Sequence, residues 1–516
     1  MRRALAALLA TSLLAGCTAG PNYHVPDKAM AKSPSANRPF MSGQEGAFDQ
    51  APLPDHWWQL YNDARLDGYV LEALTANTDL RAADANLRRA SAVVREVEAG
   101  RTVQTSISAA ALDAYVGGYT LTVPLDVPHS ASVSASIDYP LDLAGGIRRG
   151  IEAAKDDREA VEAARDQVRV TIAATVTRSY ADVCSANVTL AATRHVLDVQ
   201  TQTLASINRL FKGGRGTAFD VTRARTAADK SAASIPEIVA ARQASLYELA
   251  ALMGRAPSDY PVELESCAEP PKLSKPMPIG DGTALIRRRP DIRASERQLA
   301  AATAGIGVQM AKLYPQVSLA GSAGFANSIS NFFTGPSFGG FAGPLISWVF
   351  PNRKAIHAEI AQAGDAADAA SAKFDGTVIE ALRQTETALD AYAREIEHDG
   401  ALEKTRDDAA KSTDQAGKLF RYGRTDVLNV LTAQANLAEA EAALAQSRAT
   451  LIDRQVNVFL ALGGGWEDQP HPPLQAEGDH AKHGGGVEAG AAPASSGDTP
   501  PPPAAPAVPL PLRGRI

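Results

Sequence analysis

Apolar residues in this chain recur mostly at helical spacing, over stretches longer than an ordinary globular helix. Val161, Val168, Ile172 and Val176 are spaced seven and four residues apart, with small alanines between them. This spacing is typical of a coiled-coil seam, and alanines let neighbouring helices approach closely. The proline-free stretches 147–211 and 353–421 therefore predict two helices on the order of 100 Å long, at about 1.5 Å per residue.

Shorter helical patterns accompany both long ones. We expect helices over 64–100 and up to Met253 in the first half, and over 290–313 and up to Leu462 in the second. Pro290 suits the first turn of a helix, where its missing N–H is not needed. Pro236 lies inside a helical pattern and predicts a kink.

The two halves of the chain form an internal duplication. Residues 210–215 (Leu-Phe-Lys-Gly-Gly-Arg) correspond to residues 419–424 (Leu-Phe-Arg-Tyr-Gly-Arg), and the same offset relates Gly254 to Gly463. This organisation predicts a first repeat over 63–255, a Pro-rich linker over 256–283, a second repeat over 284–467 and a disordered tail over 468–516.

Between the helices, each repeat contains alternating strand patterns. Val133, Ala135, Ile137 and Tyr139 alternate with serines and Asp138, and a similar Ser/Gly alternation runs from Val317 to Phe325. One apolar and one polar face suits a strand between lipid and a watery lumen. A soluble antiparallel sheet with one solvated face is the alternative.

Beyond the N-terminal segment no apolar run reaches 18 residues, so a membrane-crossing part would have to be a closed barrel. Four strands per chain cannot enclose a lumen, whereas twelve from a C3 trimer can. The predicted fold is mainly α with a membrane β-barrel: a trimeric 12-stranded barrel, four strands per chain, continued by a long α-helical barrel.

The N-terminus resembles a bacterial lipoprotein signal. Arg2 and Arg3 precede an apolar stretch that ends in Leu14-Ala15-Gly16-Cys17. We expect residues 1–16 to be a signal peptide and residues 17–62 to be a lipid-anchored N-terminal segment, with a covalent lipid on Cys17 and no other cofactor. Thr18, and not aspartate, follows the cysteine, which favours the outer membrane.

The two other cysteines are Cys184, in a helical pattern, and Cys267, in the linker. An exported chain enters an oxidising compartment, so we predict a disulfide between them. Two separate buried thiols are the alternative.

Composition supports packed helices and excludes one class of partner. The chain is 45% apolar, mostly Ala, Leu and Val, and only 6% aromatic. A net charge of -7 without a dense Lys/Arg cluster argues against nucleic-acid binding.

Two motifs suggest chemistry only weakly. Gly335-Pro336-Ser337-Phe338-Gly339 matches a nucleophile-elbow pattern, but that motif requires a helix after the serine, and here a strand-like segment follows. His480 and His483 lie in the Gly/Ala/Pro-rich tail and would make a weak metal site. We expect neither catalysis nor a resident metal.

Several spaced motifs then carry a family resemblance: residues 57–63 (Trp-Trp-Gln-Leu-Tyr-Asn-Asp), 73–80, 288–293, 313–319 and 462–466. Over residues 1–467 the chain resembles the outer membrane efflux lipoproteins of the NodT type, relatives of TolC and OprM. The resemblance implies a homotrimeric exit duct in the outer membrane, spanning into the periplasm. It also implies a periplasmic adaptor, an inner-membrane pump of the RND type, and passive conduction of small molecules.

The resemblance also suggests site residues. The helix tips would face the adaptor through Gly214, Arg215, Gly423 and Arg424. We expect Arg421, Tyr422 and Asp426 to tie neighbouring tips into a closed periplasmic gate; a solvated helix tip is the alternative.

The sequence departs from the family pattern in two places. Thr432 stands where OprM-like members carry an acidic residue in the lumen, and Gly100-Arg101-Thr102-Val103 lacks the Leu-Pro type turn of Leu313-Tyr314-Pro315, which leaves the start of the first strand open.

Two other functions remain possible at this point. One is a duct of a type I protein secretion system. The other is a periplasmic adaptor or structural coiled-coil lipoprotein, which would show one hairpin instead of two.

Overall fold

The fold is described from a computed structural model. The description covers residues 18–44, 46–112, 130–328, 332–333, 335–351 and 353–464. All of these belong to one compact unit, Met1–Glu467; the second unit, Asp468–Ile516, lies outside the described residues, as do Cys17 and the tail histidines.

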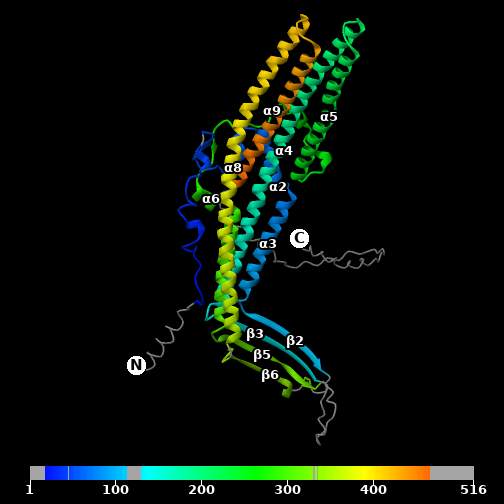
Figure 1. Cartoon of the computed structure of the whole chain (residues 1–516). Coiled ribbons are helices and arrows are strands. Elements are labelled where there is room, and N and C mark those ends of the chain that lie inside the picture. The colour runs from blue at the N-terminus through cyan, green and yellow to red at the C-terminus, as the bar shows by residue number, and fades with distance from the viewer. Residues whose placement is uncertain are drawn as a thin grey trace, which may run out of the picture. The chain divides into compact units, whose positions relative to one another are not determined.

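Helices dominate this unit, and they occur in two equivalent series (Figure 1). The first series is α2 (Ala64–Ala76), α3 (Thr78–Ala99), α4 (Gly146–Lys212) and α5 (Ala218–Leu252). The second series is α6 (Gly282–Arg288), α7 (Pro290–Ala311), α8 (Lys354–Arg421) and α9 (Val427–Ala461).

Three of the four matching pairs have nearly the same length in the two series; α2 and α6, with 13 and 7 residues, differ. Helices α4 and α8 have 67 and 68 residues, α5 and α9 have 35 each, and α3 and α7 have 22 each. The predicted duplication is therefore visible element by element. No helix of the described ranges combines the length and the apolar character needed to cross a bilayer.

The helix expected over 64–100 is divided in two, which corrects the prediction. The side chain of Asn77 accepts hydrogen bonds from the backbone N–H groups of Asp79 and Leu80, and so caps α3. Its amide also donates to the carbonyl of Leu252, which ties this break to the end of α5. Asparagine competes with the helix backbone in this way and favours a cap. Helix α5, by contrast, continues through Pro236.

Four antiparallel strands form a sheet in the order β2-β3-β5-β6. The strands are β2 (Gln104–Leu112), β3 (Ser130–Leu141), β5 (Gln316–Ser328) and β6 (Phe338–Ser347). Strand β2 begins at the position equivalent to the start of β5. The first repeat has no counterpart of Pro315 before its first strand, but this does not shift the start of that strand. A second, two-residue parallel pair joins β1 (Phe48–Asp49) to β4 (Met277–Pro278).

The N-terminal segment packs along the second series of helices. The carboxylate of Asp375 on α8 accepts a hydrogen bond from the backbone N–H of Met30 (2.7 Å). Glu386, also on α8, accepts from Met41 and Ser42 (2.8 and 3.0 Å). Helix α8 thus provides acceptors for a segment that has few backbone partners of its own.

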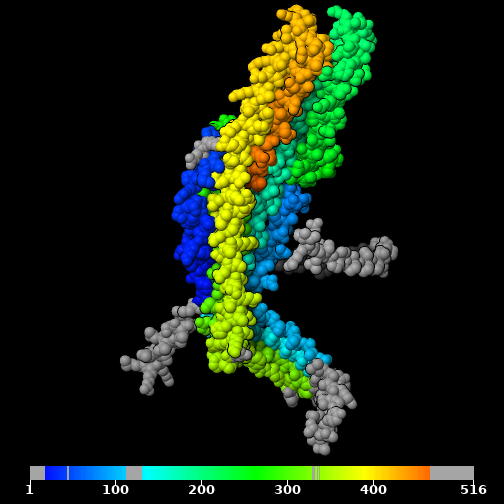
Figure 2. Space-filling view, in the orientation of Figure 1, coloured from blue at the N-terminus to red at the C-terminus, as the bar shows by residue number. Residues whose placement is uncertain are grey.

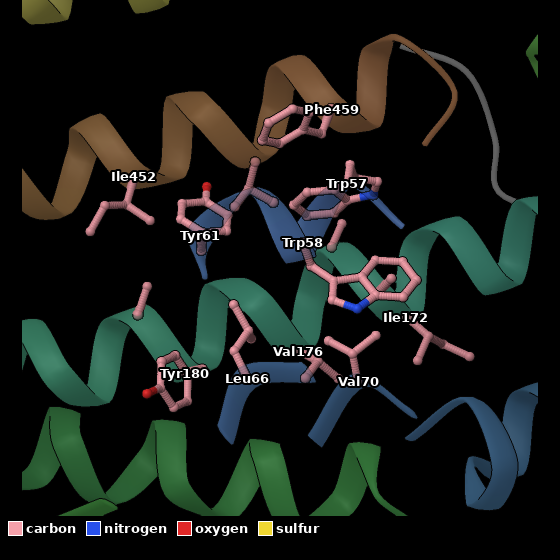
Figure 3. Close-up of a cluster of buried hydrophobic side chains, with 14 of the residues drawn as sticks. Trp57, Trp58, Tyr61, Leu66, Val70, Ile172, Val176, Tyr180, Ile452 and Phe459 are labelled. Atoms are coloured by element: carbon pink, nitrogen blue, oxygen red, sulfur yellow. The ribbon is translucent and has the colours of Figure 1, made fainter. Parts of the chain in front are cut away.

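The main core lies where this segment enters the helix bundle (Figure 3). Trp57 and Trp58 are fully buried, and Trp57 stacks on Phe459 of α9 with ring centroids 4.5 Å apart. Val176 and Tyr180 of α4 pack in the same cluster. Burial of two tryptophans joins the N-terminal segment, α4 and α9 into one folding unit.

Candidate functional site

The two hairpins, α4–α5 and α8–α9, end in tips that lie at the end of the helices opposite the sheet (Figure 1). Each tip turns at a glycine in the left-handed region, with φ of 71° at Gly214 and 67° at Gly423. The next residue closes a six-residue loop: the N–H of Arg215 donates to the carbonyl of Leu210, and that of Arg424 to Leu419. This is the Schellman motif, which satisfies the last helix carbonyls.

After each turn, the following helix begins with a side-chain cap. Thr217 and Asp220 form a reciprocal capping box at the start of α5. At the equivalent positions, Asp426 accepts a hydrogen bond from the backbone N–H of Asn429 (2.9 Å). Part of the carboxylate of Asp426, predicted to serve the gate, is thus used in folding its own tip.

The other predicted tip and gate residues lie on the surface of the single chain. Tyr422 is 80% exposed, and Arg215, Arg421, Arg424 and Thr432 are also exposed. Within the part of the chain that the structure describes, no hydrogen bond joins Arg421, Tyr422 and Asp426 to one another.

A cleft of about 1000 Å³ separates the two hairpin tips. The space-filling view shows the two tips standing apart at this end (Figure 2). Arg209 and Arg215 line the cleft from one hairpin and Arg421 from the other. Three guanidinium groups and the carboxylate of Asp414 thus give the cleft a charged lining of both signs.

Sequence reasoning missed Arg209 and Gln434 as cleft residues. Gln434, on α9, lines the cleft and donates to the hydroxyl of Thr203 on α4 (2.9 Å), which links the two hairpins below the tips. No local pattern signals this role, because the two residues are 231 positions apart and meet only through helix packing.

At the other end of the helices, strands β2, β3 and β5 give the sheet an apolar face and a serine-bearing face, as the alternation predicts, whereas β6 places Phe341 and Leu345 on the serine face. The register pairs Ile107 with Ala135, and Val133 with Phe325, on the apolar face. On the opposite face, hydroxyl groups pair across the strands: Ser106 with Ser136 (2.7 Å) and Ser108 with Ser134 (2.9 Å). The apolar side chains remain exposed in the single chain, including Ile107 (83%) and Ile346 (70%).

The linker between the repeats is fixed to α4. A disulfide joins Cys184 to Cys267, with the Cα atoms 5.1 Å apart. Beside it, the amide of Asn187 donates to the carbonyls of Leu264 and Cys267 (2.9 and 3.2 Å). Covalent and polar contacts thus hold the linker at a single place on the helix.

The nucleophile-elbow pattern does not have the required context. Ser337 ends a short 3-10 helix, Gly335–Ser337, and is followed directly by strand β6. An elbow needs a helix after the serine. Among the described residues there is no cluster of three or more His, Cys, Asp or Glu that could hold a metal ion.

Comparison with known proteins identifies the family to which this architecture belongs. A model of the family "outer membrane efflux protein" matches residues 70–255 and 283–464, which coincide with the two repeats. Nodulation protein T of Rhizobium leguminosarum bv. trifolii is 26% identical over 462 residues, covering 88% of this chain and 96% of that protein. The probable efflux pump outer membrane protein TtgC of Pseudomonas putida is 27% identical over 485 residues, covering 91% and 97%.

Solved structures show the same fold. The outer-membrane channel OprN is 32% identical with a TM-score of 0.78, covering 87% of this chain and all of that one. The MtrE outer membrane channel of Neisseria gonorrhoeae matches with a TM-score of 0.73 at 22% identity. The chain therefore belongs to the outer membrane efflux protein family, the TolC-like channels through which tripartite efflux systems open to the exterior.

Proposed function

We propose that three copies of this chain form one exit duct, which conducts small molecules passively and performs no covalent chemistry. The open edges of the four-stranded sheet are the main support for this proposal. Within the described residues, the outer edges of β2 and β6 have no partner strand, although both faces are already differentiated. Open edges pair readily with other strands, and three four-stranded sheets complete a barrel wide enough for a lumen.

The tips support docking of a periplasmic adaptor, with an inner-membrane pump of the RND type behind it. Gly214 and Gly423 have open space around them, so a partner can approach the backbone of both turns. Arg215 and Arg424 project beside these glycines, and their guanidinium groups offer donors to the partner.

The gate is assigned to the second hairpin, where Arg421, Tyr422 and Asp426 would meet the neighbouring subunit. Hydrogen bonds worth about 0.5 to 1.5 kcal/mol each would hold the resting tips together. Thr432 has no charge, so a carboxylate ring is not expected at its position.

Covalent lipid on Cys17 would anchor the N-terminal segment in the outer membrane.

The gate is tested by single-channel recording of Arg421→Ala against Lys212→Ala, its equivalent in the first hairpin. Arg421→Ala is expected to raise the resting conductance, whereas Lys212→Ala leaves it unchanged. A resting conductance of Arg421→Ala equal to wild type would count against the gate.

The proposed duct is tested by the mass of the purified assembly and by deletion of the gene. Native mass spectrometry of the purified protein is expected to give three chains; a monomer would refute the assembly. Deletion is expected to sensitise cells to drugs, dyes or metal ions. Loss of a secreted protein with unchanged sensitivity would instead indicate a duct for protein secretion.

A further inference from the structure

Helix α4 begins with an unusual charge arrangement. Its first turn contains Arg148 and Arg149 and no acidic residue, although positive charge near a helix N-terminus is unfavourable. Asp142 compensates in part, because its carboxylate accepts from the backbone N–H groups of Ile147 and Arg148. Arg149 is different, because its side chain is only 3% exposed and needs its own acceptors.

These acceptors come mainly from the start of the N-terminal segment. The Nε atom of Arg149 donates to the carbonyl of Ala19 (3.1 Å). Its Nη2 atom donates to the carbonyl of Gly20 (3.1 Å) and to Oδ1 of Asn22 (2.7 Å). Its Nη1 atom pairs with Glu152 (2.7 Å). Every nitrogen of the guanidinium is thus satisfied, and two of the three bind the segment.

The backbone around Arg149 is shaped to admit this segment. Gly20 has φ of 84°, and a Cβ atom there would collide with the backbone of Gly307 on α7. A Cβ atom on Gly307 would in turn collide with the carbonyl of Ala19 and the side chain of Arg149. The N–H of Ala19 also donates to the carbonyl of Ala144 (2.9 Å), just before α4. Residues 19–22 therefore occupy a fitted site at the point where β3 leads into α4.

We propose that Arg149 is a positioning residue for the lipid anchor. It fixes the chain two residues after Cys17 to the strand–helix junction, so that the acyl chains enter the membrane at the level where the strands begin. This inference rests on the proposed lipidation of Cys17. Lysine cannot replace Arg149, because one ammonium group cannot reach acceptors on three residues of the segment in the same planar geometry.

Hydrogen exchange of the full-length protein in lipid bilayers, followed by mass spectrometry, tests the site. Arg149→Ala and Arg149→Lys are expected to speed exchange of the amides in residues 18–25 at least about tenfold. Residues 29–44, held by Asp375 and Glu386, should stay unchanged. Arg148→Ala is the matched control, since Arg148 is adjacent and bonds only Asp142 among its described partners.

Three results would overturn the inference. If amide exchange of residues 18–25 is unchanged in Arg149→Ala, Arg149 does not hold this segment. Equal acceleration throughout the chain would reduce Arg149 to general stability, as would full rescue by lysine. The mass of the N-terminal peptide reports lipidation separately: a peptide without acyl chains would refute the anchor itself, whatever the exchange data say about Arg149.

Discussion

At the residue scale, stability depends on a few long-range contacts of single side chains. The disulfide between Cys184 and Cys267 closes a loop with a sequence separation of 83, and both cysteines are buried. Arg289, at the start of α7, donates to the carbonyl of Ala461 at the end of α9 (2.6 Å) and pairs with Asp291. The disulfide thus ties the linker to the first repeat, and Arg289 ties the start of the second repeat to its end.

Removal of both cysteines by Cys184→Ala with Cys267→Ala should destabilise the protein. The unfolded chain regains the entropy of a long loop, which is worth about 4.5 kcal/mol in the chain-entropy account. The unfolding midpoint in denaturant measures the effect. Reductant should shift the wild type in the same direction and leave the double variant unaffected. Two free thiols in the unfolded, unreduced wild type would contradict the bond.

A half-buried carboxyl makes stability depend on pH. Burial raises the pKa of Asp182 on α4 to about 6, Arg178 opposes this rise, and Asp453 and Glu248 add to it. The folded state thus holds this proton more tightly than the unfolded state, whose pKa is near 3.8. Stability should therefore increase as the pH falls from about 6 towards 4, and this gain is lost as the pH rises through 6.

Asp182→Asn should reduce the dependence of the unfolding free energy on pH. The reduction is at most about 1.4 kcal/mol per pH unit, which is the contribution of one titrating proton. Thermal unfolding between pH 4 and 7 measures it. Asp408→Asn is the control, because the side chain of Asp408 is 78% exposed. Identical pH profiles for Asp182→Asn and wild type would contradict the assignment.

At the element scale, the two hairpins have the same turn geometry with different side chains. Thr217 and Asp220 in one correspond to Asp426 and Asn429 in the other, and all four positions serve helix capping. The Schellman geometry recurs at Gly254 and Gly463, at the far ends of α5 and α9. The duplication therefore preserves backbone requirements while the side chains diverge.

Replacing either of two glycines near one tip by alanine should change local stability in opposite directions. Gly423→Ala places a Cβ atom at φ of 67°, which costs about 1 kcal/mol, so amides of the tip should exchange roughly fivefold faster. Gly417→Ala lies inside α8 with open space around it and should stabilise that helix by up to about 1 kcal/mol. Amide exchange over residues 412–426 compares them. Protection that rises in both variants would argue against the left-handed turn.

At the scale of the whole molecule, one sheet must satisfy two environments. Ile107 and Ser108 are neighbours on β2, but Ile107 lies on the apolar face and Ser108 bonds Ser134 on the serine face. A single chain leaves both faces exposed, so the distinction acquires meaning only in the assembled membrane protein.

Ile107→Lys should reduce assembly in the outer membrane much more than Ser108→Lys. A lysine facing lipid near the midplane costs about 2 to 4 kcal/mol, whereas a lumen-facing lysine stays hydrated. The yield of trimer extracted from outer membranes measures both. Equal loss for the two variants would mean that the serine face does not line water.

The sequence by itself determined the parts whose information is local. Helical spacing, proline-free length, serine alternation and the repeated Gly-Arg turn predict α4, α8, the sheet and both tips, because each depends on residues within one or two turns or one strand. The family followed from spaced motifs, and the predicted fold and channel function agree with the relatives found.

Only the tertiary structure decided the contacts between distant segments. The bond that ties Asn77 to the carbonyl of Leu252 joins residues far apart in the chain, as does the bond from the cleft residue Gln434 to Thr203 across the hairpins. Arg149 reads as an ordinary surface cation until Ala19, Gly20 and Asn22 are placed around it. The physical reason is that a buried polar side chain is defined by acceptors far away in the chain, and local periodicity carries no information about them.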